Sequence, residues 1–417
     1  MIIYVIIAFV AILIGMAISV SAFGTGGKRK KIFQDIYFSV EDVDGIGVLY
    51  TKTGEYSAIL KMENPVQKYS ANIDSYYEFN HLVTALAQTL GEGYAIHKQD
   101  VFVRKQFQDE SNDNHEFLSE SYFKYFNGRS YTDSQTYLII TQENKKSRIF
   151  SFDSKKWRDF MVKIRKVKDQ LKDSGVEASY LDGNTAREYV DRYFSMNFND
   201  KTVSMTNFKV DEESICMGNK RCKVYSLVDV DCVSTPSIVR PFTNIEVNNV
   251  SMPVDMVSLV DSIPSADVVV YNQMFFIPNQ KRELSLLDKK KNRHASMPNP
   301  SNQIAVEDIK KVQDVIAREN KQLVYAHFNL VVGVPIDADI QKCTNHLENS
   351  FGRLGIHISK RAYNQLELFV NSFPGNCYST NPEYDRFLTL SVAACLLALF
   401  GKQIEEVAIN HVVKKWT

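Results

Sequence analysis

The sequence predicts an α+β fold in which a single N-terminal transmembrane helix precedes two mixed α/β regions. Three observations lead to this prediction. Residues 2–23 form an apolar run without a charged side chain. A segment with helical periodicity at 75–90 lies between segments rich in β-branched and aromatic residues. Strand-like and helix-like segments then alternate between residues 306 and 370.

Residues 1–27 are predicted to form a transmembrane anchor followed by a glycine hinge. At a rise of 1.5 Å per residue, about 20 apolar residues span the roughly 30 Å hydrocarbon core of a bilayer. Lys28, Arg29, Lys30 and Lys31 follow the apolar run directly, and the positive-inside tendency therefore places the rest of the chain in the cytoplasm. A cleaved signal peptide is the alternative, although its positive charges would precede the apolar run.

Composition places the remainder among ordinary globular proteins. The 417 residues suffice for two or three domains, and 44% hydrophobic residues exclude wholesale disorder. Lys and Arg together number 49, as do Asp and Glu, so the net charge is zero. This balance argues against binding to a polyanion through bulk charge. Six cysteines are too few for a disulfide scaffold.

Residues 28–146 are predicted to form an N-terminal α+β domain. Two β-prone stretches within 48–61 flank a Lys-Thr-Gly turn and predict a hairpin. The helix at 75–90 starts with a capping box of Ser75 and Glu78 and ends before Gly91. Strands are expected at 94–104 and 137–141.

Residues 147–417 are predicted to form the second α+β region. The expected helix at 156–172 has a strongly basic face, which is a solvated surface or, alternatively, a docking site for an acidic partner or nucleic acid. A strand is expected at 268–276, a mobile basic loop at 288–303, and a strand at 323–334 among the alternating elements. The apolar run at 386–400 is too short for a comfortable membrane span and predicts a buried helix. No internal repeat is evident.

Sequence motifs for catalysis are absent from the chain. The pattern G-x-x-x-x-G-K-[ST] does not occur, so there is no phosphate-binding loop of a RecA-like ATPase. H-E-x-x-H and G-x-S-x-G are also missing, and Cys216, Cys222 and Cys232 do not have the spacing of common zinc modules. His97 and His327 lie in strand-like segments and are interpreted as core histidines. We therefore expect no catalytic, cofactor-binding or metal-binding residues and no enzymatic activity in this chain.

Three segments together resemble a known family: 97–105, 117–141, and 366–376 followed by 387–401. They are similar to the N-terminal region of Bacteroidetes-type TraG conjugation proteins, the conjugative ATPases of type IV secretion systems. The resemblance implies an α+β region that precedes an ATPase domain, at the bacterial inner membrane. This sequence stops 41 residues after Asn376, about where the ATPase domain of the family would begin.

The resemblance favours a membrane-anchored, non-catalytic component of a conjugative DNA-transfer apparatus that docks partner proteins or a separate ATPase subunit. One alternative is the truncated or split front half of a conjugative ATPase. The other is a generic single-span protein with a cytoplasmic binding domain. Direct binding of nucleic acid is not expected from any of them.

Two places in the matched segments are candidate partner contacts. Arg129 follows Asn127-Gly128 and is predicted to lie in a turn before a strand, where pairing with a nearby carboxylate is the plainer role. Pro374, Gly375 and Asn376 form a turn by composition, and in the family this turn lies just before the motor domain.

Overall fold

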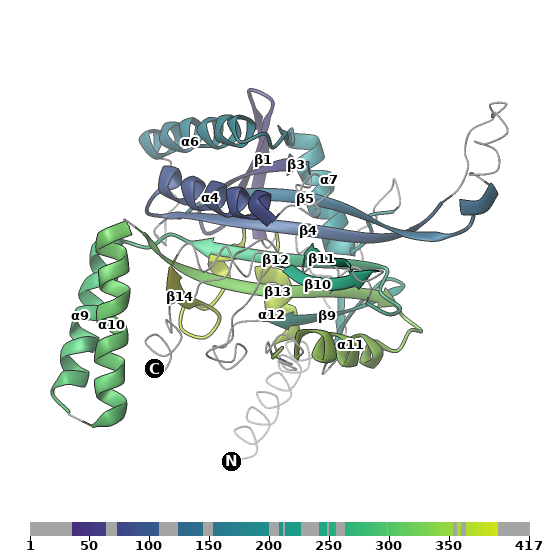
Figure 1. The fold of residues 1–417 in the computed structure, drawn as a ribbon. Helices are drawn as coiled ribbons and strands as arrows, with labels where there is room; N and C mark the ends of the chain where they lie inside the picture. The colour runs from purple at the N-terminus through teal and green to yellow at the C-terminus, as the bar shows by residue number, and fades with distance from the viewer. Residues whose placement is uncertain are drawn as a thin grey trace, which may run out of the picture. The chain divides into compact units, whose positions relative to one another are not determined.

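The structure is a computed structural model (Figure 1) that describes one compact unit within residues 36–417. The described residues are 36–63, 73–107, 124–144, 153–199, 208–211, 213–226, 242–247, 250–255, 263–297, 299–319, 321–352, 357–359 and 364–390.

A large antiparallel sheet organises this unit. Its strands are β1 (Tyr37–Val43), β2 (Ile46–Thr51), β3 (Tyr56–Met62), β4 (Tyr94–Gln106), β5 (Ser130–Gln142), β6 (Ala178–Tyr180), β7 (Phe208–Val210), β8 (Ile215–Met217), β9 (Lys220–Ser226), β12 (Val268–Phe276), β13 (Leu323–Pro335) and β14 (Phe387–Leu390). The order along the sheet is β1-β2-β3-β5-β4-β12-β13-β9-β8-β7, with β6 paired to β3 and β14 to β13. A separate ribbon consists of β10 (Phe242–Val247) and β11 (Val250–Asp255).

The strand order contains an internal repeat. The first five strands of the chain have the order β1-β2-β3-β5-β4, and the second set, β7, β8, β9, β12 and β13, has the same order read from the opposite edge. The two halves meet where β4 pairs antiparallel with β12. The two halves also share a later pairing. In the first half β6 pairs with β3, and in the second half Ser359 forms a bridge to Ser226 of β9, the strand equivalent to β3. The sheet is thus built from two similar halves around an approximate twofold axis.

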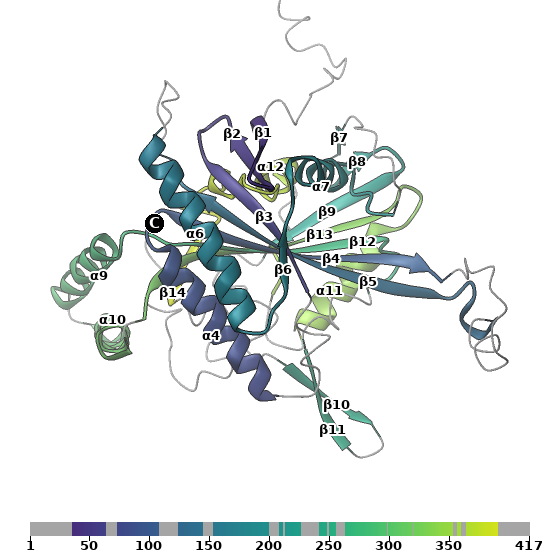
Figure 2. The same ribbon diagram turned by 90° about the horizontal axis from the view of Figure 1, so that it is seen from above.

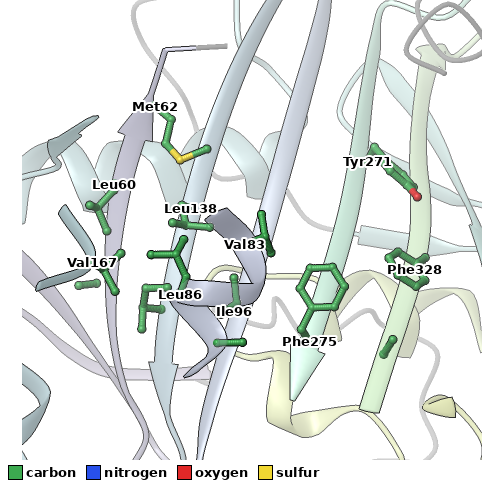
Figure 3. Close-up of a cluster of buried hydrophobic side chains, with 14 of the residues drawn as sticks. Leu60, Met62, Val83, Leu86, Ile96, Leu138, Val167, Tyr271, Phe275 and Phe328 are labelled. Carbon is green, nitrogen blue, oxygen red and sulfur yellow. The ribbon is translucent and has the colours of Figure 1, made fainter. Parts of the chain in front are cut away.

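The helices are distributed over both faces of the sheet. They are α4 (Ile73–Leu90), α6 (Ser154–Asp173), α7 (Gly183–Ser195), α9 (Gln280–Ala295), α10 (Pro300–Glu319), α11 (Ile340–Gly352) and α12 (Gln365–Asn371). Buried side chains of α4, α6 and α11 share one apolar cluster with the sheet; Leu86 of α4, Val167 of α6 and Ile96 of β4 lie in it (Figure 3). Figures 1 and 2 show α4 and α6 stacked over β3, β4 and β5.

The opposite face carries α7 and α12. Tyr189 of α7 contacts Gln99, whose side chain lies on the opposite face from Ile96 because successive residues alternate across a strand. The ring of Tyr193 stacks on Phe369 of α12, with centroids 5.6 Å apart. Helices on both faces explain why every residue of β12 is buried, including the polar Asn272 and Gln273.

Several predicted elements are confirmed. The hairpin expected within 48–61 is β2 paired with β3, and the helices expected at 75–90 and 156–172 are α4 and α6. The strand expected at 268–276 has the bounds of β12. The prediction of a basic loop at 288–303 is wrong, because α9 and α10 occupy most of these residues. The run at 386–400 starts as strand β14, and its remainder lies outside the described residues.

The predicted fold class is wrong. Strands from both predicted regions, between Tyr37 and Leu390, belong to one twelve-stranded antiparallel sheet. The described residues therefore do not form two separate mixed regions. None of the described helices is long and apolar enough to cross a membrane. The predicted location as a single-pass inner-membrane protein with a cytoplasmic part is corrected by the same finding. Residues 1–27 and the basic residues Lys28, Arg29, Lys30 and Lys31 lie outside the described part, as does the boundary at 146, which stays a prediction.

Candidate docking surface

Strands β4 and β5 extend beyond their neighbours as a two-stranded arm. Pairing of β4 with β12 ends at Val103, and pairing of β5 with β3 ends at Thr136. Arg104 N still donates to Asp267 O at 2.8 Å, and beyond it residues 105–106 pair with residues 130–131 of the other strand. Figure 2 shows this β4–β5 arm leaving the sheet at the right. An arm without neighbouring strands offers both faces to solvent.

Polar side chains hold the base of the arm together. Lys105 of β4 forms an ion pair with Asp133 of β5, and both side chains are about one-third exposed. Gln135 Nε2 donates to the same carboxylate at 3.2 Å, and Tyr137 Oη donates to Gln135 Oε1 at 2.7 Å. This chain of contacts follows one strand from the buried sheet to the exposed arm, and it links the position of the arm to the core.

Backbone hydrogen bonds link the two sides of the arm at the end of its described part. Phe107 N donates to Arg129 O and Gly128 N donates to Phe107 O, both at 2.8 Å. Gly128 has a φ of +77°, a left-handed conformation that favours glycine. This turn sets the direction in which the Arg129 side chain leaves the arm.

Arg129 lies over an aromatic ring at this end. Its guanidinium carbon is 3.6 Å from the ring centroid of Tyr125 and 5.8 Å from that of Phe126. Tyr125 is 59% exposed, and Tyr131, which follows in β5, is 47% exposed. We call Tyr125, Phe126, Arg129 and Tyr131 the tip cluster. The predicted alternative, pairing of Arg129 with a carboxylate, is not seen among the described residues.

The chemistry of the tip cluster suits recognition of a protein. An arginine held on an aromatic face gains about 0.5–1 kcal/mol at an exposed site and keeps its N–H groups available at the guanidinium edge. Tyrosine and arginine are enriched among the side chains that carry most of the binding energy in protein interfaces. Of the tip cluster, only Arg129 was predicted from the sequence as a partner contact; the dense aromatic residues around it were the signal for its neighbours.

The predicted partner contact at Pro374, Gly375 and Asn376 lies away from the tip cluster, in the interior of the protein. All three residues are buried. Tyr37 Oη donates to Pro374 O at 2.6 Å, and Asn376 Nδ2 donates to Val370 O at 2.9 Å. The turn thus ties the end of α12 to the first strand of the sheet. The structure does not bring it together with Arg129.

A buried polar network at the centre of the sheet is the other concentration of functional groups. It includes His97 and Gln99 of β4, Asn272 of β12, and His327 and Asn329 of β13, all fully buried. His97 Nε2 lies 3.1 Å from Asn272 Oδ1, and His327 Nδ1 lies 2.7 Å from Asp385 O. Burial lowers the pKa of His97 to about 3. These contacts agree with the interpretation of both histidines as core residues.

The described residues contain no group of three or more His, Cys, Asp or Glu side chains arranged to hold a metal ion. Comparisons with models of known protein families and with curated proteins find no match for this chain. The tip cluster is therefore assigned from its own geometry.

Proposed function

We propose that this protein is a docking subunit of a conjugative DNA-transfer apparatus of the type IV secretion class, and that it has no catalytic role of its own. Its partner is another protein of the apparatus or a separate ATPase subunit. The resemblance of residues 117–141 to conjugation proteins supports the choice of apparatus. One observation carries the docking role: the guanidinium of Arg129 stacked on the exposed ring of Tyr125 at the end of a projecting arm.

The arm position supports a contact role more than a structural one. The tip cluster lies beyond the last residue of β4 that pairs with β12, so its side chains add little to the sheet core. Large exposed aromatic side chains have a solvation cost that burial against a partner removes. The tip cluster is therefore expected to become buried in the assembled apparatus.

The test compares a tip variant with a matched control in a donor strain that carries the neighbouring transfer genes. We expect the Tyr125→Ala/Arg129→Ala variant to lose copurification with transfer proteins and to lower transfer frequency about tenfold or more, since two interface anchors are worth at least about 1.4 kcal/mol. Arg318→Ala, which removes an exposed arginine from α10, serves as the control and should change neither.

Two outcomes would contradict the proposal. The first is a tip variant that folds normally, copurifies with the same proteins and supports normal transfer. The second is ATP hydrolysis by the purified chain that survives removal of contaminating ATPases, because the proposal gives this chain no catalytic role.

A further inference from the structure

Helices α9 and α10 form a hairpin that leaves the sheet at the end opposite the β4–β5 arm (Figures 1 and 2). Its position follows from the repeat: the hairpin lies between β12 and β13, the arm extends from the equivalent strands β4 and β5, and β4 and β12 run antiparallel. A small core at its base contains Leu287 of α9, Ile309 and Val312 of α10, and Leu323 of β13. The hairpin is thus anchored at one end only.

The outer side of α9 and the residue after its C-cap present a stripe of five large side chains. They are Arg282, Leu286, Lys289 and Arg293 of α9, and Met297, which follows the C-cap Ser296; we call them the α9 stripe. At roughly 3.6 residues per turn the four positions on α9 fall within about 60° of the helix circumference. All five are exposed, and the two apolar members, Leu286 and Met297, are 45% and 65% exposed.

No carboxylate belongs to the α9 stripe, and the acidic groups of α9 are engaged elsewhere. Glu283 is buried and accepts a hydrogen bond from Tyr325 Oη at 2.9 Å. Asp288 accepts from Lys291 Nζ and from Gln313 Nε2, each at 2.8 Å, on the side that faces α10. Within the described part of the chain, Arg282 and Lys289 form no ion pair. The stripe is therefore a cationic surface with exposed apolar side chains between its charges.

We infer that the α9 stripe is a docking site for an acidic amphipathic helix of a partner protein. Arg282 and Lys289 are separated by about 10.5 Å along α9, and Lys289 and Arg293 by about 6 Å. Carboxylates spaced by seven and four residues on a second helix match these separations. Leucine-type side chains on the same face of that helix would cover Leu286 and Met297, as in helix recognition by grooves and zippers.

A nucleic-acid backbone fits the stripe less well. Phosphate contacts are made by cationic and polar groups, and such interfaces are more polar than those between proteins. Leu286 and Met297 would lie against charged phosphates in that case. The inference does not depend on the proposed role in conjugation, because it uses a different element from the tip cluster.

The experiment measures binding of the full chain to a labelled peptide by fluorescence anisotropy. The peptide has about 20 residues, with glutamates and leucines on one face at helical spacing, because shorter isolated helices are marginal in water. We expect saturable binding that weakens about tenfold or more in the Arg282→Glu/Lys289→Glu variant. Leu286→Ser should weaken it about threefold or more, since it removes apolar contact area.

Matched controls distinguish peptide binding at the α9 stripe from a general effect of charge. Lys310→Glu reverses an exposed cation on α10 of the same hairpin and should change affinity less than about twofold. The Tyr125→Ala/Arg129→Ala variant should bind the peptide with the affinity of the original chain. This control keeps the test of the α9 stripe separate from the test of the proposed docking role of the tip cluster. Circular dichroism checks that each variant keeps its helix content.

Three results would overturn the inference. One is no saturable binding at peptide concentrations of about 100 μM. Another is equal affinity for a peptide of the same composition whose leucines are scattered around the helix. The third is that a DNA duplex of about two turns binds as tightly as the peptide and that its binding is lost in the same variants. This result would assign the α9 stripe to nucleic acid.

Discussion

Gln99 of β4 lies directly opposite Asn272 of β12, and its side-chain amide donates to Asn272 Oδ1 at 2.7 Å. Both residues are fully buried at the place where the two similar halves of the sheet meet. Asn272 Nδ2 in turn donates to Asn329 Oδ1 at 2.8 Å and to Tyr193 Oη at 3.3 Å. Tyr189 of α7 donates to Gln99 Oε1 at 2.9 Å. The centre of the seam is therefore a connected network of buried polar side chains.

Replacing Asn272 by leucine should destabilise the protein by about 2–4 kcal/mol. The substitution removes one buried hydrogen bond from each of Gln99, Asn329 and His97, and each unmade buried hydrogen bond costs about 1–3 kcal/mol, partly relieved by local rearrangement. Urea unfolding followed by fluorescence measures the change. Asn349→Leu on the exposed side of α11 is the control and should stay within about 0.5 kcal/mol. Equal effects of the two substitutions would show that the network is energetically unimportant.

Buried His97 makes stability depend on pH. Burial lowers its pKa in the folded state to about 3, against the ordinary value of 6.5, and the nearby His327 adds to the lowering while the bond to Asn272 opposes it. The unfolded chain therefore binds the proton first, and stability present above about pH 6.5 is lost as the pH falls towards about 3. This contribution has a slope of up to about 1.4 kcal/mol per pH unit.

The His97→Gln variant should lack this slope between about pH 6 and pH 4, because glutamine does not titrate. The measurement is the difference in unfolding free energy between variant and original chain at several pH values. His357→Gln, at an exposed position, provides the comparison and should follow the original chain. A parallel pH profile for His97→Gln would refute the assignment.

Local sequence patterns predicted many elements but not their assembly. The apolar spacing of α4 and the β-rich composition of β12 are short-range signals, and both elements lie at the expected residues. α9 was missed because its lysine-rich sequence has few apolar positions; Asn279, which caps it by accepting from Arg282 N at 2.8 Å, was the available signal. A cap of this kind marks a helix start even where the apolar stripe is weak.

The repeat was not visible in the sequence, for a physical reason. Equivalent strands continue into different structures: β4 and β5 extend as a two-stranded arm, whereas a helical hairpin lies between β12 and β13. Pairing between β4 and β12 depends on contacts between residues far apart in the chain, such as Gln99 and Asn272. The candidate site was predicted in part: Arg129 was placed in a turn, whereas its stacking on Tyr125 depends on the geometry of that turn.

Gly375 should tolerate substitution less well than another glycine with the same backbone conformation. Gly375 and Gly93 have φ values of +78° and +81°. A Cβ atom at Gly375 would lie 2.5 Å from Ser57 Oγ, whereas one at Gly93 would meet no atom within 4 Å. Gly93→Ala should cost about 1–2 kcal/mol from backbone strain alone, and Gly375→Ala about 1–3 kcal/mol more. Thermal unfolding of both variants tests the difference, and equal losses would contradict the packing seen at Ser57.

Chemical labelling should distinguish the described cysteines by their burial. Cys222, Cys343 and Cys377 are buried, and burial raises the pKa of their thiols to about 12, 11 and 12. Only the thiolate reacts, so at about pH 8 these three should be modified slowly by iodoacetamide. Cys216 is only partly buried and should react first, as judged by peptide mass spectrometry at timed intervals. In urea the four cysteines should react at similar rates, because unfolding removes the burial that protects three of them. Labelling of Cys222 as fast as Cys216 in the folded protein would contradict the described core around β9.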